Sequence, residues 1–328
     1  MKKSILLILL SFSSLLLSAQ NALYWEVQNN NFIDNREYYN DYNTGQTMLG
    51  SHLSLTTGFS IDSVHFMNFG LDFLYEYGTS SQYIKTSPII YYNYKKGNID
   101  FLMGAFPRLN RLAYPDILIT DTIAYYRATI EGAMLNVKYK YGEQNIWIDW
   151  TSRQSETTNE SFMAGSSGKF KYNYLVFENY MYMYHQSTTS VKDTSFHIKE
   201  NRGALFLFGL DFTDKLYSRF YIGPALSYNK TVPENYIFSK GFYAKYEFEY
   251  KFYQLRLTHY SGDKMNLING DHFYNAQNYT RFDNEISFFN SKSIKLQLQF
   301  SVHFFDNEYD FSQRLLLYYK INANRKIK

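Results

Sequence analysis

The sequence has no cysteine, only five prolines and almost no net charge. Without cysteine, the chain has no disulfide framework, no thiolate nucleophile and no cysteine for lipid modification. The 33 basic and 30 acidic side chains give a net charge of +3 without a polybasic tail, so nucleic acid is not an expected partner. Few prolines suit long hydrogen-bonded strands, because proline cannot donate to a ladder. Any metal site would need His, Asp or Glu, and we expect neither a metal nor another cofactor.

Long apolar runs are absent beyond the N-terminus. There, two lysines precede an apolar segment over residues 5–17, and Ser18-Ala19 provides a small-residue cleavage site. Serines interrupt the segment, which is shorter than the roughly 20 residues that a membrane-spanning helix needs. We therefore predict a cleaved signal peptide over 1–19 and a single mature domain over 20–328.

What the chain has instead is alternation of apolar with polar side chains. Because strand side chains point to opposite faces with period two, the segment 294–304 predicts a strand with one apolar and one polar face. The pattern recurs over 133–140, 242–250 and 314–321. A charge on a lipid-facing surface costs roughly 2–4 kcal/mol at mid-membrane, so the charged face is expected to look inward. The apolar set of the first segment is Ile294, Leu296, Leu298, Phe300, Val302 and Phe304.

Candidate strands of this kind run along the whole mature chain. Their connections alternate, with long ones such as 108–126 and 262–280 after odd strands and short turns after even ones. Aromatic residues make up 20% of the chain, a composition typical of barrels with aromatic girdles. We predict an all-β fold, a transmembrane antiparallel up-and-down β-barrel of about 16 strands (14–16), with the short turns and both termini on the periplasmic side. The predicted strands are 22–32, 46–60, 63–77, 86–95, 98–107, 127–141, 144–154, 161–171, 173–185, 202–213, 216–228, 239–250, 252–261, 281–290, 292–304 and 313–322.

The predicted size of the barrel indicates its function. About sixteen strands leave an aqueous channel unless something fills the interior. We therefore predict a porin-like channel for passive diffusion of small hydrophilic solutes. The connection 108–126 mixes charges with apolar residues, which fits either a loop that folds inward as a constriction or an ordered outer loop.

Charged residues near the outer end of the predicted lumen are the candidate selectivity site. Asp149 and Arg153 lie about 13 Å apart along one strand, too far to pair directly, so each is expected to meet a charge on a neighbouring strand. Opposed acidic and basic rows create a transverse field that selects solutes by charge, although the same residues can simply satisfy one another in a wet wall. The predicted pore-lining and constriction residues are Arg108, Arg111, Arg127, Glu131, Asp149, Arg153 and Glu160.

Aromatic side chains near these charges suggest saccharides as solutes. Tyr125, Tyr126 and Trp147 are the candidates for stacking on a sugar ring. The alternative is that aromatic clusters arise from composition alone, since the chain has 34 tyrosines.

Four segments resemble a known class of barrel. They are Phe32–Tyr38, Gly104–Arg108, Trp147–Gln154 and Gly270–Tyr274. Together with the overall plan, they are similar to porin-type outer-membrane barrels of Gram-negative bacteria, specifically to uncharacterised barrels of the Bacteroidetes type. The resemblance implies the fold, an outer-membrane location and contact with outer-membrane lipid, but no substrate. The tail 322–328 departs from the aromatic residue on which such barrels often end.

The sequence also leaves functions other than a channel open. The chain could be a non-conducting barrel that binds a surface partner or serves as an accessory subunit of an envelope complex, and homo-oligomer formation is compatible with the sequence. A hydrolase is disfavoured because no Gly-x-Ser-x-Gly elbow accompanies the seven histidines, so we expect no enzyme. Loss of a hydrolase activity on changing His185 or His272 would argue otherwise. The oxygen-rich loop 262–283 matches no calcium-loop spacing, so no metal is assigned to it.

Overall fold

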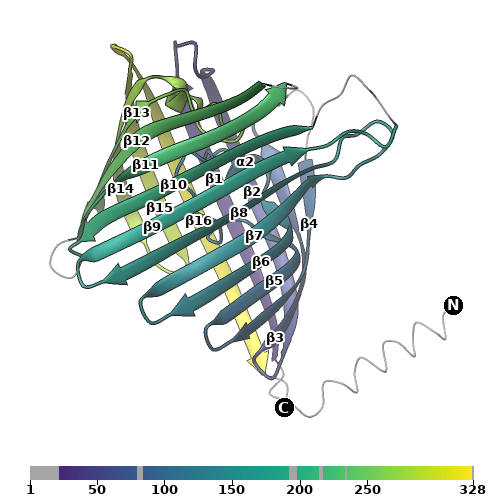
Figure 1. The fold of residues 1–328 in the computed structure, drawn as a ribbon. Helices are drawn as coiled ribbons and strands as arrows, with labels where there is room; N and C mark the ends of the chain where they lie inside the picture. The colour runs from purple at the N-terminus through teal and green to yellow at the C-terminus, as the bar shows by residue number, and fades with distance from the viewer. Residues whose placement is uncertain (1–21, 80–83, 192–197, 214–216, 233–234, 327–328) are drawn as a thin grey trace.

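Sixteen antiparallel strands close into one barrel in the computed structural model (Figure 1). The structure describes residues 22–79, 84–191, 198–213, 217–232 and 235–326, and the predicted signal peptide lies outside them. Each strand pairs with its neighbours in sequence, and β1 pairs with β16 to close the ring. The strands are β1 Ala22–Glu37, β2 Gln46–Ile61, β3 His65–Glu76, β4 Ile84–Lys96, β5 Ile99–Pro107, β6 Thr129–Tyr139, β7 Gly142–Ser152, β8 Ser161–Tyr172, β9 Leu175–Gln186, β10 Lys199–Asp211, β11 Tyr217–Val232, β12 Asn235–Tyr250, β13 Tyr253–Gly262, β14 Asn278–Asn290, β15 Ile294–Phe305 and β16 Glu308–Lys326.

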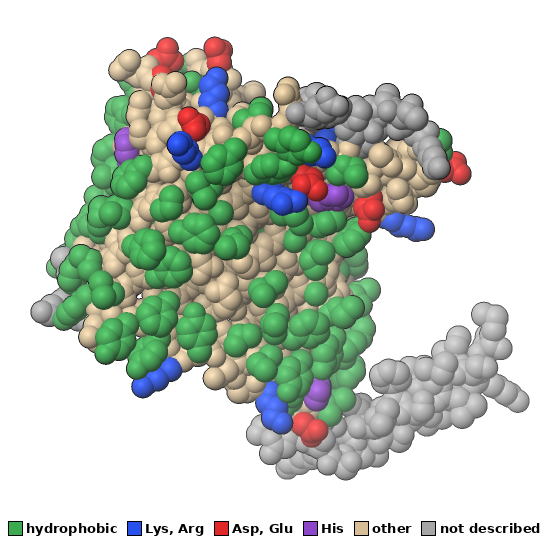
Figure 2. Space-filling view, in the orientation of Figure 1, with side chains coloured by type: hydrophobic (Ala, Val, Ile, Leu, Met, Phe, Trp, Pro, Cys, Tyr) green, Lys and Arg blue, Asp and Glu red, His purple; other side chains and the backbone are tan. Residues whose placement is uncertain are grey.

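The predicted alternation of faces is present in the barrel wall. On β15, Phe300 and Phe304 are exposed on the outside, whereas Ser301 and His303 are buried on the inside. Figure 2 shows the resulting band of hydrophobic side chains on one face of the barrel, with charged side chains gathered above and below it. Closure leaves no sheet edge, so backbone groups that face hydrocarbon are hydrogen-bonded. The predicted fold class is therefore confirmed. Among the described residues, no helix has the length and hydropathy to cross a bilayer.

Strand ends differ from the sequence prediction at several places. The tail after residue 322 continues β16, because Lys326 pairs with Ala22 of β1. The strands β11 and β12 extend into the expected long connection 229–238. The strands β15 and β16 meet at Asp306 and Asn307, which have φ of 44° and 75°. Positive φ at two successive turn residues suits the tight type I′ hairpin, which Asp and Asn tolerate.

The two ends of the barrel are different. Short turns connect even strands to the next strand, and the start of β1 and the end of β16 lie at that same end, which we call the turn end (Figure 1). The opposite end, which we call the loop end, carries the longest connections, 108–128 and 263–277. The first connection contains α2, Ile123–Tyr126, and the second contains the 3-10 helix η1, His272–Asn275.

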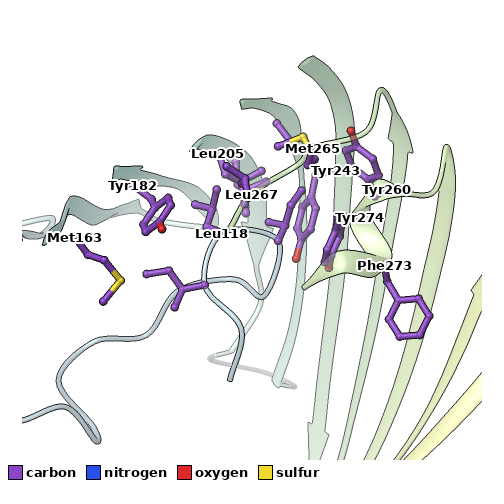
Figure 3. Packing of buried hydrophobic residues seen from close by; sticks show 14 of the residues in the cluster. Leu118, Met163, Tyr182, Leu205, Tyr243, Tyr260, Met265, Leu267, Phe273 and Tyr274 are labelled. Carbon is purple, nitrogen blue, oxygen red and sulfur yellow. The ribbon is translucent and has the colours of Figure 1, made fainter. Parts of the chain in front are cut away.

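These two connections fold into the barrel and fill its loop end; together we call them the plug. Leu118 and Leu267 pack among wall residues in one buried apolar cluster (Figure 3). The two segments pair through their backbones, since Thr120 N donates to Asn269 O at 2.7 Å. The wall makes room at Gly203, where an added Cβ would lie 2.6 Å from Leu118 Cδ2. Of the two alternatives for 108–126, the structure therefore shows the inward fold.

Candidate functional site

Both ends of the first plug segment are tied to one carboxylate on the wall. Asp149 on β7 forms an ion pair with Arg108, and its Oδ1 lies 3.2 Å from Arg127 Nη2. The same Oδ1 accepts a hydrogen bond from the Glu131 backbone N at 3.0 Å. Asp149 and Arg108 are almost completely buried. Asp149 therefore meets charged partners, but they belong to the plug segment and not to a neighbouring strand as predicted, and the contact anchors the plug.

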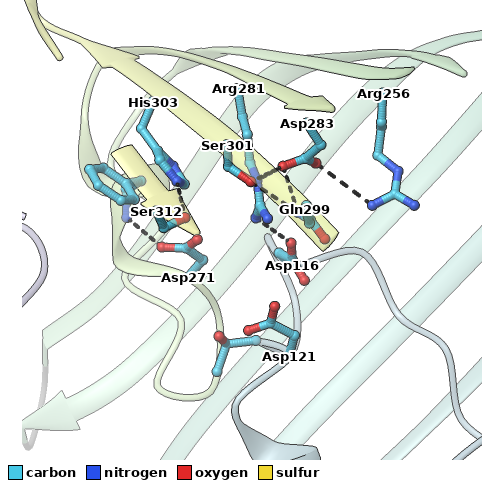
Figure 4. Close-up of polar contacts among 12 residues, drawn as sticks. Asp116, Asp121, Arg256, Asp271, Arg281, Asp283, Gln299, Ser301, His303 and Ser312 are labelled. Carbon is cyan, nitrogen blue, oxygen red and sulfur yellow. Dashed lines mark hydrogen bonds and ion pairs between the residues drawn. The ribbon is translucent and has the colours of Figure 1, made fainter. Parts of the chain in front are cut away.

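A second charged network holds the middle of that segment (Figure 4). Arg281 on β14 contacts Asp116 Oδ2 through Nη1 and Asp283 Oδ1 through Nε, both at 2.7 Å. Burial raises the pKa of Asp116 to about 6, against the opposing charge of Arg281. Asp116 is thus partly protonated near neutral pH, which makes this contact sensitive to pH.

Asp121, five residues further on, has the opposite behaviour. It forms ion pairs with Arg36 at 2.9 Å and with Arg314. Burial alone would raise the pKa of Asp121, but the guanidiniums of Arg314 and Arg36 outweigh it and hold the pKa well below its ordinary value. Asp121 therefore stays ionised and is the permanent electrostatic attachment of α2 to β1 and β16.

The other predicted pore-lining residues do not come together in a constriction. Arg111 points toward the turn end, where its guanidinium lies 5.7 Å from the Tyr91 ring centroid. Glu131 is exposed and shares the outer face of β6 with Leu135, so its assignment to the pore lining is wrong. Arg153 and Glu160 lie in the outer connection between β7 and β8, beyond the strand ends. A role of the remaining residues in selecting solutes stays a prediction.

The three predicted sugar-stacking residues are mostly occupied by other contacts. Tyr125 is buried and stacks on Phe32, with ring centroids 4.2 Å apart. Trp147 is buried, and its Nε1 donates to Tyr114 OH at 2.9 Å. Tyr126 is more exposed than either. These contacts stabilise the plug and leave the faces of Tyr125 and Trp147 little room for a sugar.

Two histidines of the wall take part in structural contacts inside the barrel. The ring nitrogens of His52 face Asp72 Oδ1 and Tyr125 O, each at 2.8 Å. Ser54 donates to Asp72 rather than to the histidine. Since both nitrogens of His52 are engaged, it cannot take a proton from Ser54 or from a water. The cluster fastens α2 to β2 and β3.

His303 has a serine partner but is enclosed. Its Nε2 lies 3.2 Å from Ser312 Oγ (Figure 4). Its Nδ1 lies 2.8 Å from Tyr279 OH, and its ring stacks on Phe273 of η1. The adjacent cavity, lined by Ser312, has about 10 Å³, which is room for one water at most. A substrate cannot reach this pair.

His185 is different because it faces outward at the loop end. It lies directly opposite Glu200 in the register of β9 and β10, and its Nδ1 is 3.9 Å from Glu200 Oε1. Arg202 Nη2 contacts the other oxygen of Glu200 at 2.6 Å, and the Arg202 side chain is 52% exposed. By strand alternation, His185 shares the outer face of β9 with the exposed Met181. This is an accessible base–carboxylate pair with a cation beside it.

Aromatic rings support this pair from the side. The His185 ring stacks on Phe162 at 5.0 Å between centroids, and Phe162 stacks on Trp150 at 5.2 Å. Toward mid-barrel, the outer face of β9 and β10 is apolar, with Met181 and Phe208 exposed. The pair therefore lies where the apolar band meets the polar rim. His185 was among the histidines noted in the sequence, but Glu200 was missed because the predicted strand began two residues after it.

The lumen on the turn side of the plug is open. One cavity of about 500 Å³ is lined by polar residues that include Arg111, Lys138 and Glu178. A second cavity of about 350 Å³ lies beside α2 and has a mostly apolar wall. Within the described ranges, no three or more His, Asp or Glu side chains are arranged to hold a metal ion.

Solved structures with this fold are outer-membrane barrels. OccAB3 of Acinetobacter baumannii superposes with a TM-score of 0.53 at 14% identity, covering 92% of this chain and 99% of that one. OccAB4 of the same organism gives 0.51 at 12% identity, covering 92% and 98%. The outer-membrane protein OccK1 (OpdK) of Pseudomonas aeruginosa gives 0.51 at 9% identity, covering 92% and 99%. At these identities the likeness shows the barrel fold alone. No curated protein matches the sequence.

The family comparison bears on activity. A family model described as lipid A 3'-O-deacylase-type matches residues 15–327. That description names an enzyme activity, so the expectation of a protein without enzymatic function is overturned. The match spans nearly the whole chain, and the chain therefore belongs to the lipid A 3'-O-deacylase-type family.

Proposed function

We propose that the protein is an outer-membrane hydrolase that removes an ester-linked acyl chain from a lipid A-type glycolipid. The observation that carries this proposal is the pair His185 and Glu200, which faces outward where the apolar band meets the polar rim. In a membrane, acyl ester bonds lie at that same boundary between hydrocarbon and headgroup. The family description supports the reaction class.

The geometry supports hydrolysis with His185 as general base. With substrate bound, Glu200 is expected to accept a hydrogen bond from Nδ1–H, which leaves Nε2 to take a proton from a water as its oxygen attacks the ester carbonyl. The tetrahedral intermediate then breaks its bond to the sugar oxygen, and His185 returns the proton to that oxygen. The products are a fatty acid and a free hydroxyl. The 3.9 Å separation of Nδ1 and Oε1 is expected to shorten with substrate bound, as catalytic hydrogen bonds often do.

Arg202 supplies positive charge next to this pair. Its guanidinium contacts Glu200 and is half exposed, so it can also meet an anionic oxygen of the substrate. A cation near the carbonyl stabilises the oxyanion that develops during attack. The exposed Met181 and Phe208 offer an apolar surface along which the acyl chain can lie.

The test uses intact cells and a matched histidine control. The full chain is produced in the outer membrane of a Gram-negative host, and the host lipid A is extracted and weighed by mass spectrometry. We expect the wild-type protein to remove one acyl chain and His185→Ala to leave the lipid unchanged. His272→Ala, an exposed histidine of η1, should act as wild type. Unchanged lipid with the wild-type protein, or full activity of His185→Ala, contradicts the proposal.

Passive diffusion of small hydrophilic solutes is the second candidate. The polar cavity of about 500 Å³ at the turn end favours it, because solutes entering from that side meet a hydrated vestibule. The apolar cluster of the plug opposes it, because that cluster fills the loop end. Passage therefore requires the plug to move. No contact among the residues that the structure describes specifically favours saccharides, a binding partner at the surface or homo-oligomer formation, so these stay predictions.

A further inference from the structure

We infer that the cavity beside α2 is a binding site for a small amphipathic carboxylate. It has about 350 Å³, within the range of small-molecule sites. It extends from Lys295 and Tyr318, near the turn end, to Asp121 and Tyr125 under the plug. The site lies inside the barrel and is separate from His185 and Glu200, so the inference does not depend on the proposed hydrolysis.

The wall of the cavity selects an apolar body. Phe32, Ile89, Leu109 and Leu316 line it, and Phe32 is held flat against Tyr125 with an angle of 4° between the rings. Such a surface gains free energy when it is covered by apolar groups. A purely polar solute would leave it in contact with water.

The acidic groups that line the cavity are already paired. Asp72 is engaged by His52 and Ser54, and Asp121 is engaged by Arg36 and Arg314. These carboxylates therefore do not offer a free negative charge to a cationic ligand. The one charged side chain of the cavity that has no ion-pair partner among the described residues therefore decides which polar group a ligand needs.

That remaining charge is Lys295. It is half-buried, points inward from β15 opposite Tyr318, and forms no ion pair with any residue in the described part of the chain. The nearby Glu26 is taken by Lys320. An ammonium in a partly dehydrated cavity favours an anion, and a carboxylate is the compact anion that an apolar body of this size can carry. The ligand class is thus a monocarboxylic acid with a short aliphatic or aromatic body.

The test compares a carboxylate with its neutral analogue. Binding of hexanoate and of 1-hexanol to the purified full chain in detergent is measured by isothermal titration calorimetry. We expect hexanoate to bind at least tenfold more tightly than hexanol, and Lys295→Met to remove that difference. Lys292→Met, an exposed lysine in the adjacent turn, is the matched control and should bind as wild type. Equal hexanoate affinity in Lys295→Met and wild type overturns the inference.

A second variant tests the place of binding. Ala124 of α2 lines the cavity, so Ala124→Phe fills it. We expect this variant to lose hexanoate and hexanol binding while keeping the heat-dependent gel migration of a folded barrel. Unchanged binding in Ala124→Phe, or no saturable binding to the wild-type protein, overturns the site.

Discussion

Arg108 and Asp149, 41 residues apart in sequence, form an ion pair with side-chain exposures of only 3% and 0%. Arg127, at the far end of the same plug segment, reaches the other oxygen of Asp149. One buried carboxylate thus fixes both ends of a segment that crosses the lumen. Removing one member of a buried pair is costly, because the partner charge stays buried without compensation.

The first prediction concerns this anchor. Asp149→Ala leaves Arg108 uncompensated, and we expect the free energy of unfolding to fall by about 3–5 kcal/mol. Urea unfolding of the folded barrel in detergent micelles measures the change. Arg153→Ala, four positions on and exposed, should alter it by less than about 0.5 kcal/mol. If Asp149→Ala lowers the free energy of unfolding no more than Arg153→Ala does, the ion pairs of Asp149 do not contribute to stability.

The second prediction concerns the apolar cluster of the plug. Leu118 is fully buried, so Leu118→Ala should cost about 2–5 kcal/mol through lost packing and a new cavity. Leu109, in the same segment but 40% exposed, provides the control, and Leu109→Ala should cost much less. The same urea titration applies. An equal loss in the free energy of unfolding for Leu118→Ala and Leu109→Ala would show that Leu118 is not packed against the wall.

The third prediction concerns conduction. Because the plug fills the loop end, single-channel recordings of the wild-type protein should show little or no conductance. Replacing residues 110–125 with a short Gly-Ser linker removes the part of the plug that crosses the lumen, and we expect stable open channels. A wild-type conductance equal to that of the shortened variant would show that the lumen is open in the native barrel.

The fourth prediction concerns pH and Asp116. Its pKa is about 6 in the folded protein and ordinarily 3.8, so the folded state binds the proton more tightly. The extra stability that proton binding to Asp116 gives the folded state is fully present below pH 3.8 and is lost as pH rises through about 6. Asp116→Asn cannot ionise. The stability of wild type relative to Asp116→Asn should therefore fall between about pH 4 and pH 7.

Urea midpoints at several pH values measure this difference. The pKa of Asp121 is lowered, so Asp121 stays ionised over this pH range. The pH dependence that it gives to the free energy of unfolding lies at lower pH. Asp41→Asn, at an exposed position of the loop after β1, is the control and should follow wild type. A difference in urea midpoint between wild type and Asp116→Asn that stays constant across this pH range would contradict the raised pKa of Asp116.

Period-two alternation predicted the wall correctly because lipid permits few exceptions at mid-membrane. Phe300 and Ser301 illustrate this, since either one on the wrong face would put a polar group in hydrocarbon or a ring in the lumen. The rule weakens at the ends of the strands. Glu131 faces outward as the third residue of β6, near the loop end. A charge costs less free energy there than at mid-membrane, so alternation is enforced less strictly.

The contacts between distant segments were not predictable from the sequence. Asp116 meets Arg281 across 165 residues, and no local pattern encodes that pairing. Glu200 faces His185 only because of the register between β9 and β10, and a register depends on a hairpin whose length the sequence does not specify. The candidate site on the outer face therefore needed the three-dimensional structure.

The most direct test of this account compares two histidines in one assay. Purified wild-type protein, His185→Ala and His52→Ala are reconstituted with a lipid A-type glycolipid, and the initial rate of fatty acid release is measured per folded molecule. We expect His185→Ala to lose at least about 100-fold in rate, because it lacks the general base, and His52→Ala to stay within about twofold of wild type. The opposite order, with His52 required and His185 dispensable, would place the chemistry inside the barrel and contradict the account.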